Sequence, residues 1–159
     1  MSQAGTIDGL QFAHDRSRVA GQLALAAFPR LAASGASAAD IAYAIEGGAN
    51  AQGRPSLRVA ASGNVALACQ RCLQPLDVAI AVDADLELAE SLAAAEGAND
   101  EVDRVVASRS MGVAALIEDE VLLALPMVAL HEHCELPAEG DAPKPSPFAV
   151  LAGLKPKGG

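Results

Sequence analysis

Residues 76–88 read LDVAIAVDADLEL, the clearest apolar–polar alternation in this chain of 159 residues. From position 78 on, every even position is apolar, whereas the odd positions from 77 on carry alanines and acids. A period of two places successive side chains on opposite faces of a strand. The stretch therefore predicts a half-buried strand with an acidic outer face. The acids of that face are Asp77, Asp83, Asp85 and Glu87.

Shorter stretches upstream alternate in the same way. Residues 56–60 and 64–69 are separated by Ala61, Ser62 and Gly63, a spacing that predicts a hairpin. Further strands are predicted at IDGLQF (7–12), RVAGQLAL (18–25) and DIAYAIEG (40–47). Connections this short favour antiparallel pairing over parallel crossovers. We therefore expect an antiparallel sheet, and the pattern leaves a barrel-like closure open.

One amphipathic helix is predicted within MGVAALIEDEVLLALP (111–126), where Pro126 ends the helical pattern. Its acids at 118–120 are neighbours in sequence and point around the helix, so they predict a solvated face rather than paired catalytic carboxylates. A shorter alanine-rich helix is predicted near residues 28–33. These elements indicate a single α+β domain over residues 1–136. The apolar face of the longer helix comprises Val113, Leu116, Ile117, Val121, Ala124 and Leu125.

The C-terminal residues 137–159 are predicted to be a separate segment. A linker rich in Pro, Gly and acids leads to KPSPFAVLAGLK, in which Ser146 is a helix N-cap and Pro147 the first helical residue. Phe148, Leu151 and Leu154 recur every three residues and form an apolar side. We interpret this side as a helical docking segment for a partner. The alternative is a strap that packs on its own domain.

The three cysteines suggest a metal site. A cytosolic chain keeps its thiols reduced, so spaced cysteines indicate metal or catalysis before disulfides. Cys69 and Cys72 form a C-x2-C turn between two predicted strands, and HEHC (131–134) supplies Cys134 with a histidine. His131 repeats the two-residue spacing, and His133 is the alternative ligand. We expect a closed tetrahedral zinc site formed by Cys69, Cys72, His131 and Cys134, and therefore a structural one. Reduced thiols without a metal remain an alternative.

The distribution of charge argues against direct nucleic-acid binding. The chain carries a net charge of −9 and only 3% aromatic residues. Residues 72–143 hold sixteen acids against two arginines, a net charge of −14. A phosphate backbone is repelled by such a block, and a single-strand platform requires aromatic rings. A basic protein would be attracted to it. The alternative is an acidic surface that only keeps the protein soluble.

Nothing in the sequence indicates export or membrane insertion. The opening residues MSQAGTIDGLQFAHDR lack the pattern of a secretory signal. The longest apolar run, residues 121–130, is interrupted by Pro126 and is too short to span a bilayer. We therefore expect a cytoplasmic protein without a membrane partner.

The motifs described above also resemble a known family. CQRCLQP (69–75), IEDEVLLALPMVALHEHCE (117–135) and KPSPFAVLAGLK (144–155) together resemble the YceD family of large ribosomal RNA subunit accumulation proteins. The stretches 7–21 and 53–72 continue the resemblance. It implies a role in accumulation or maturation of large-subunit ribosomal RNA in bacteria or plastids. The family's cysteine pair falls on Cys69 and Cys72, and its later cysteine on Cys134. The two-histidine stretch before that cysteine is shortened here, so the resemblance does not choose between His131 and His133.

Charge and resemblance together predict a non-catalytic ribosome-biogenesis factor. We expect its acidic surface to bind a basic ribosomal protein or large-subunit assembly factor, and ribosomal RNA to benefit indirectly. No small-molecule substrate is expected. Two enzymatic alternatives remain, namely an RNA-processing enzyme that acts directly on precursor ribosomal RNA and a CxxC thiol oxidoreductase. The redox alternative lacks the usual context, because the cysteine pair lies between strands rather than at a helix N-terminus.

Overall fold

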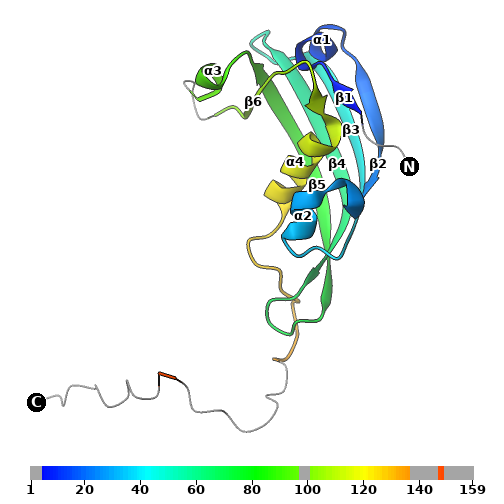
Figure 1. Ribbon diagram of the computed structural model, residues 1–159, viewed down its shortest axis with the longest axis vertical. Coiled ribbons are helices and arrows are strands. Elements are labelled where there is room, and N and C mark those ends of the chain that lie inside the picture. The colour runs from blue at the N-terminus through cyan, green and yellow to red at the C-terminus, as the bar shows by residue number, and fades with distance from the viewer. Residues whose placement is uncertain (1–4, 97–100, 137–146, 149–159) are drawn as a thin grey trace, which may run out of the picture.

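A computed structural model describes residues 5–96, 101–136 and 147–148 of the chain (Figure 1). Its centre is a five-stranded sheet with the strand order β2-β3-β4-β5-β6. The sheet does not close into a barrel, because β2 and β6 lie at opposite edges. The fold is therefore α+β around a mostly antiparallel open sheet. Its strands are β2 (Arg18–Ala24), β3 (Ala38–Ala49), β4 (Pro55–Ala68), β5 (Pro75–Ala89) and β6 (Arg104–Val106).

The remaining elements are short apart from one helix. A two-stranded sheet pairs β1 (Thr6–Ile7) with β7 (Met111–Gly112). The small helices are α1 (Gly9–His14), the 3-10 turn η1 (Leu25–Ala27), α2 (Pro29–Ala33) and α3 (Leu92–Glu96). The longest helix is α4 (Val113–Ala124). None of the helices in the described part of the chain is both long and apolar enough to cross a membrane.

Strand β5 follows its alternating sequence as far as Leu86, after which Glu87, Leu88 and Ala89 are all buried. The inward side chains of Ile80, Leu86 and Leu88 are each 3% exposed, and they pack in one core with Ile117 of α4 and Leu31 of α2. Figure 1 shows α2 and α4 on the same face of the sheet. The opposite face has no helix over it among the described residues. This one-sided cover explains why the period of two was a reliable signal here.

Helix α4 was predicted well, with two corrections. It ends at Ala124, and Leu125 and Pro126 follow it, because proline cannot continue the hydrogen-bond ladder. Ala124 is exposed, so the buried face is slightly narrower than predicted. Glu118 was expected in solvent but is only 3% exposed. It is the cap of another helix, as described below.

The predicted hairpin around Ala61, Ser62 and Gly63 was wrong. Residues 55–68 form one long strand, and Gly63 pairs with Ile41 on one side and Ile80 on the other. A Cβ atom at Gly63 would overlap the main-chain carbonyl of Asp40. This glycine therefore allows close approach of β3 and β4 instead of making a turn.

The predicted strand at residues 7–12 was also wrong beyond its first residue. Asp8 caps α1 there, because its side chain accepts a hydrogen bond from the main-chain N–H of Gln11 at 3.1 Å. A further exception to the predictions is the parallel pairing of β5 with β6, which the intervening stretch containing α3 makes possible. The other three pairings of the five-stranded sheet are antiparallel, as expected.

Strands β4 and β5 extend beyond the other strands at one end of the sheet. The pairing of β3 with β4 ends at Ala38 and Ala66, whereas β4 and β5 continue to pair up to Ala68 and Pro75. Figure 1 shows the resulting turn protruding past α2 and α4, next to the segment that follows α4. The fold thus carries the C-x2-C motif to a protruding tip and brings the HEHC motif beside it.

A candidate metal centre at the tip of the β4–β5 hairpin

The hairpin tip brings the two predicted halves of the site together. Cys69 and Cys72 lie in the turn between β4 and β5, and His131 and Cys134 lie in the segment after α4. One potential ligand atom of each residue lies within 4.8 Å of those of the other three. Cys69 is fully buried and Cys72 is 8% exposed. Two pairs of side chains that are 59 or more residues apart in sequence thus converge on one point.

The turn geometry explains how the first pair converges. The main-chain N–H of Cys69 donates to Gln74 across the hairpin at 2.9 Å, and that of Leu73 donates back to Cys69 at 2.9 Å. Leu73 has a φ of +62°, a conformation that leucine adopts rarely. The tight turn therefore places the side chains of Cys69 and Cys72 on the side that faces His131.

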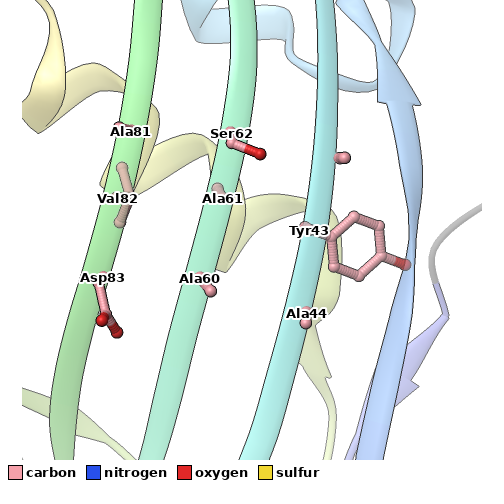
Figure 2. Close-up of a pocket in the computed structure, with 9 residues that line it drawn as sticks. Tyr43, Ala44, Ala60, Ala61, Ser62, Ala81, Val82 and Asp83 are labelled. Carbon is pink, nitrogen blue, oxygen red and sulfur yellow. The ribbon is translucent and has the colours of Figure 1, made fainter.

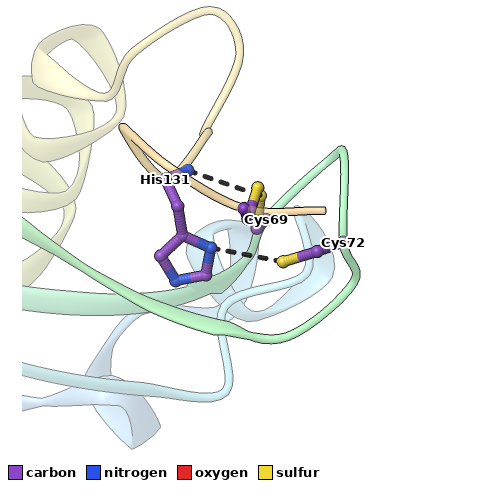
Figure 3. A group of neighbouring side chains, drawn as sticks. Cys69, Cys72 and His131 are labelled. Atoms are coloured by element: carbon purple, nitrogen blue, oxygen red, sulfur yellow. Dashed lines mark hydrogen bonds between the residues drawn. The ribbon is translucent and has the colours of Figure 1, made fainter. Parts of the chain in front are cut away.

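The second pair is held against this turn by the main chain. The N–H of Gln70 donates to the carbonyl of Ala129 at 2.8 Å, and the N–H of His131 donates to Sγ of Cys69 at 3.4 Å. Figure 3 shows the latter contact and the imidazole of His131 facing Cys72. The segment after α4 is thereby fixed against the hairpin at the point where the ligands meet.

Two of the distances between the ligand atoms are close to those of a tetrahedral zinc site. Two sulfurs bound to one zinc at about 2.3 Å lie about 3.8 Å apart in tetrahedral geometry, and a sulfur and a nitrogen about 3.5 Å apart. The Sγ atoms of Cys69 and Cys134 lie 3.8 Å apart, and Sγ of Cys72 lies 3.3 Å from Nδ1 of His131. The donor set of three sulfurs and one nitrogen is one that structural zinc sites use. The residues therefore fit a zinc ion.

A hydrogen bond on the far side of the His131 imidazole determines which ring nitrogen carries the hydrogen. Nε2 of His131 lies 3.0 Å from the main-chain oxygen of Pro75. A carbonyl only accepts, so Nε2 must carry the hydrogen, and in the neutral ring Nδ1 then presents a lone pair to the cluster. Metal-bound histidines are commonly oriented by such a second hydrogen bond. Sequence reasoning missed the carbonyl of Pro75, since a main-chain acceptor leaves no sequence signal.

The electrostatics of the thiols also suit a cation. Burial raises the pKa of Cys69, but main-chain N–H groups of Cys72, His131 and Arg71 outweigh it and lower that pKa to about 5. Burial and the neighbouring thiols of Cys69 and Cys72 raise the pKa of Cys134. The turn thus favours one thiolate, and further ionisation is opposed by repulsion. A bound divalent cation relieves that repulsion.

His133 does not belong to the cluster. It is exposed, whereas His131 is half-buried between the two cysteines of the turn. The partner-binding residues predicted on β5 occupy different positions. Asp77, Asp83 and Asp85 are exposed on the outer face of the sheet, as expected. Phe148 is 71% exposed, and Leu151 and Leu154 lie outside the described residues.

Glu87 was wrongly expected to be exposed, since only 3% of it is accessible. Its carboxylate is held by Arg54 at 2.9 Å, Arg104 at 3.1 Å and Asn50 at 2.8 Å. Burial raises the pKa of Glu87, but these hydrogen bonds and charges outweigh it and lower the pKa below its ordinary value. The acid therefore ties β5 to β6 and to the β3–β4 turn rather than facing a partner.

Comparison with known proteins agrees with the resemblance. A sequence model of the family described as "Large ribosomal RNA subunit accumulation protein YceD" matches residues 57–155, which include the whole cysteine and histidine cluster. A protein of that name from Haemophilus influenzae is 36% identical over 111 residues, which cover 59% of this chain and 62% of the relative. No solved structure matches the chain. More than half of the chain fits the family, and the chain therefore belongs to the YceD family of large ribosomal RNA subunit accumulation proteins.

Proposed function

We propose that this chain is a non-catalytic factor of ribosome biogenesis that acts in the cytoplasm. It supports accumulation or maturation of large-subunit ribosomal RNA by binding a basic ribosomal protein or assembly factor. Family membership supports the ribosomal context. The observation that carries the choice of partner is the charge on the surface of the second half of the chain.

That surface is strongly acidic. In the described part of residues 72–136, Arg109 is the exposed base, and the exposed acids greatly outnumber it. They are Asp77, Asp83, Asp85, Glu90, Glu96, Glu101, Asp103, Asp119, Glu132 and Glu135. Such a field attracts a basic protein and repels a phosphate backbone. An indirect effect on ribosomal RNA follows from this charge more readily than direct binding does.

The outer face of β5 supplies the most regular part of this surface. Asp83 forms an ion pair with Arg58 at 2.8 Å, whereas Asp77 and Asp85 form none with the described residues. Small side chains next to Asp83 leave a shallow hollow of about 390 Å³, which Figure 2 shows between β3, β4 and β5. A lysine or arginine of a partner can enter it and reach the carboxylates.

The metal cluster has a structural role in this proposal. Four protein ligands, Cys69, Cys72, His131 and Cys134, fill a tetrahedral zinc site and leave no position for a reactive water. The zinc then fastens the segment after α4 to the hairpin tip. Phe148, Leu151 and Leu154 provide a second, apolar contact to the same partner.

The test measures binding of defined components. The purified, zinc-containing protein is titrated against the isolated large-subunit ribosomal proteins and against naked large-subunit RNA. Replacing Asp77 and Asp85 by Asn is compared with replacing Glu90 and Glu96 by Gln, which changes the net charge equally at acids outside the outer face of β5. We expect the first pair to weaken binding of a basic protein by about tenfold and to reduce its salt dependence. The second pair should leave it nearly unchanged.

Three results would overturn the proposal. A tight, salt-sensitive complex with naked RNA would favour direct binding. Cleavage or modification of precursor RNA by the purified protein would favour an RNA-processing enzyme. Dithiol-dependent turnover that is lost in Cys72→Ser would favour a thiol oxidoreductase.

A further inference from the structure

Strand β2 has an open edge. The main-chain N–H of Gly47 donates to the carbonyl of Ser17, so the odd-numbered residues of β2 exchange hydrogen bonds with β3. The even-numbered residues Arg18, Ala20, Gln22 and Ala24 therefore direct their N–H and C=O groups away from the sheet. Within residues 5–96 and 101–136, no hydrogen bond reaches this outward side.

This edge lacks the devices that usually prevent pairing. Natural edge strands carry proline, charges or bulges that discourage a second strand. Strand β2 reads RVAGQLA, keeps an unbroken register with β3 and contains one charged residue, Arg18. The guanidinium of Arg18 bonds to Glu46 at 3.2 Å, on its own sheet. The strand is therefore a template for a further antiparallel strand.

We propose that β2 pairs with β2 of a second copy of this chain, antiparallel about a twofold axis through Gly21. Arg18 then lies opposite Ala24 of the second copy, and Ala20 opposite its Gln22. All four outward-facing residues of each strand gain main-chain partners, and the two sheets become one continuous sheet. Such an interface is isologous, as is usual for dimers.

The side chains suit this register on the core face. Val19 is half-buried and Leu23 is 4% exposed. Val19 of each copy would lie opposite Leu23 of the other copy. At the axis, Gly21 meets Gly21. Figure 2 shows the ring of Tyr43 extending from β3 toward β2, and a Cβ atom at Gly21 would lie only 3.1 Å from its hydroxyl oxygen. The glycine thus leaves room for this ring next to the axis.

The charges favour a second copy over the basic partner proposed above. No like charges lie opposite each other in this register, and Arg18 gives a basic protein no attraction to the edge. The acidic strand β5 is three strands away in the sheet, about 14 Å at about 4.8 Å per strand. This exceeds the Debye length of about 8 Å at physiological salt, so the net charge of −9 opposes pairing only weakly.

The test places charged side chains at Ala20 and Gln22, which the register brings opposite each other in the two copies. Ala20→Lys with Gln22→Lys places like charges opposite each other twice, whereas Ala20→Glu with Gln22→Lys places opposite charges there twice. Both variants change the same exposed outer-face positions, and both replace the hydrogen bond from Gln22 to Asp40 by a lysine beside that acid. The dissociation constant of the full-length, zinc-containing protein is measured by sedimentation and light scattering over a range of concentrations.

We expect the wild type and the Glu/Lys variant to form dimers. The Lys/Lys variant should dissociate at least about tenfold more readily than the Glu/Lys variant, with the same circular dichroism and melting temperature at monomeric concentration. A wild type that stays monomeric at all concentrations overturns the proposal and leaves the edge to a different partner. A dimer that responds equally to both variants overturns the register.

Discussion

The Nε2–H group of His131 donates a hydrogen bond to the main-chain oxygen of Pro75 across 3.0 Å. This contact fixes the ring so that Nδ1 faces the thiol of Cys72. A carbonyl at the first residue of β5 thus determines which histidine nitrogen is available to a metal. The arrangement predicts unequal roles for the two histidines of the HEHC motif.

His131→Ala should weaken zinc binding by at least about 100-fold, because loss of a ligand should cost no less than loss of an orienting partner. His133→Ala should leave binding unchanged, since His133 is exposed and outside the cluster. Metal content after purification without chelator, together with cobalt absorption spectra and chelator competition, measures this difference. Equal zinc contents in both variants would exclude His131 as a ligand.

Loss of the metal should loosen the hairpin tip and leave the sheet intact. The segment 127–136 contacts the hairpin tip through the main-chain bond to Ala129 and through the cluster itself. We expect Cys72→Ser to speed amide hydrogen exchange in residues 69–74 and 127–136, with little change in β3 and the centre of β4. Uniformly faster exchange across the whole sheet would instead indicate that the metal supports the global fold.

Glu118 caps α2 from another element. Its Oε1 atom accepts hydrogen bonds from the main-chain N–H groups of Arg30 at 2.7 Å and Leu31 at 3.0 Å. Phe28, the N-cap residue of α2, offers no side-chain hydrogen bond. Glu118→Ala should lower the free energy of unfolding by about 1–3 kcal/mol, because one buried and one partly buried main-chain donor lose their acceptor.

Asp119→Asn is the matched control for that substitution. Asp119 also pairs with Arg30, at 2.6 Å, but both side chains are about half exposed. Exposed ion pairs contribute little, so we expect a change of less than about 1 kcal/mol. Urea titration of both variants at neutral pH provides the measurement. Similar losses in the two variants would mean that the cap is unimportant.

Sequence reasoning succeeded where the signal was local. The alternation of β5 was reliable because one face of the sheet is solvated, and the C-x2-C and H-x2-C spacings each lie within one short segment. Most of the failures involve partners distant in sequence. The strand expected at residues 7–12 is an exception, since Asp8 caps α1 through nearby Gln11. Glu118 and Glu87 looked like solvated acids, and only the fold brings Arg30 and Arg104 to them. Gly63 looked like a turn residue, because the sequence does not show that the main chain of Asp40 on the neighbouring strand leaves no room for a side chain there.

The capping role of Glu118 should make stability depend on pH. Burial raises the pKa of Glu118, but the N–H groups of Leu31 and Arg30 and the Arg30 guanidinium outweigh it, so the pKa falls below its ordinary value. The unfolded chain then binds this proton at higher pH than the folded chain. The stabilisation is therefore complete above the ordinary pKa and is lost as the pH falls through the folded one. The stability difference between wild type and Glu118→Gln should shrink as the pH falls from about 5.

Glu120 provides a control of opposite sign on the same helix. Burial, followed by the charges of Asp103 and Asp119, raises the pKa of Glu120 above its ordinary value. The folded state therefore disfavours the carboxylate, and Glu120→Gln should stabilise the protein at neutral pH. The gain should vanish below the ordinary pKa, where both states are protonated. Effects of acid on the cluster of Cys69, Cys72, His131 and Cys134 are common to all variants, so differences between variants at each pH isolate the carboxylates. Parallel pH profiles for Glu118→Gln and Glu120→Gln would contradict these assignments.

Two adjacent glycines in β3 should respond differently to the same substitution. A Cβ atom at Gly47 would overlap the main chain of Phe12 in α1, whereas one at Gly48 would meet nothing within 4 Å. Gly47→Ala must push α1 from the sheet and should cost about 1–3 kcal/mol or more. Gly48→Ala should be neutral or stabilise by up to about 1 kcal/mol, because alanine restricts the unfolded chain. Both glycines lie in the same β3–β4 pairing, so the two variants change strand propensity alike. A difference between their melting temperatures therefore reports the packing of α1 against Gly47. Equal melting temperatures would show that α1 does not rest on Gly47.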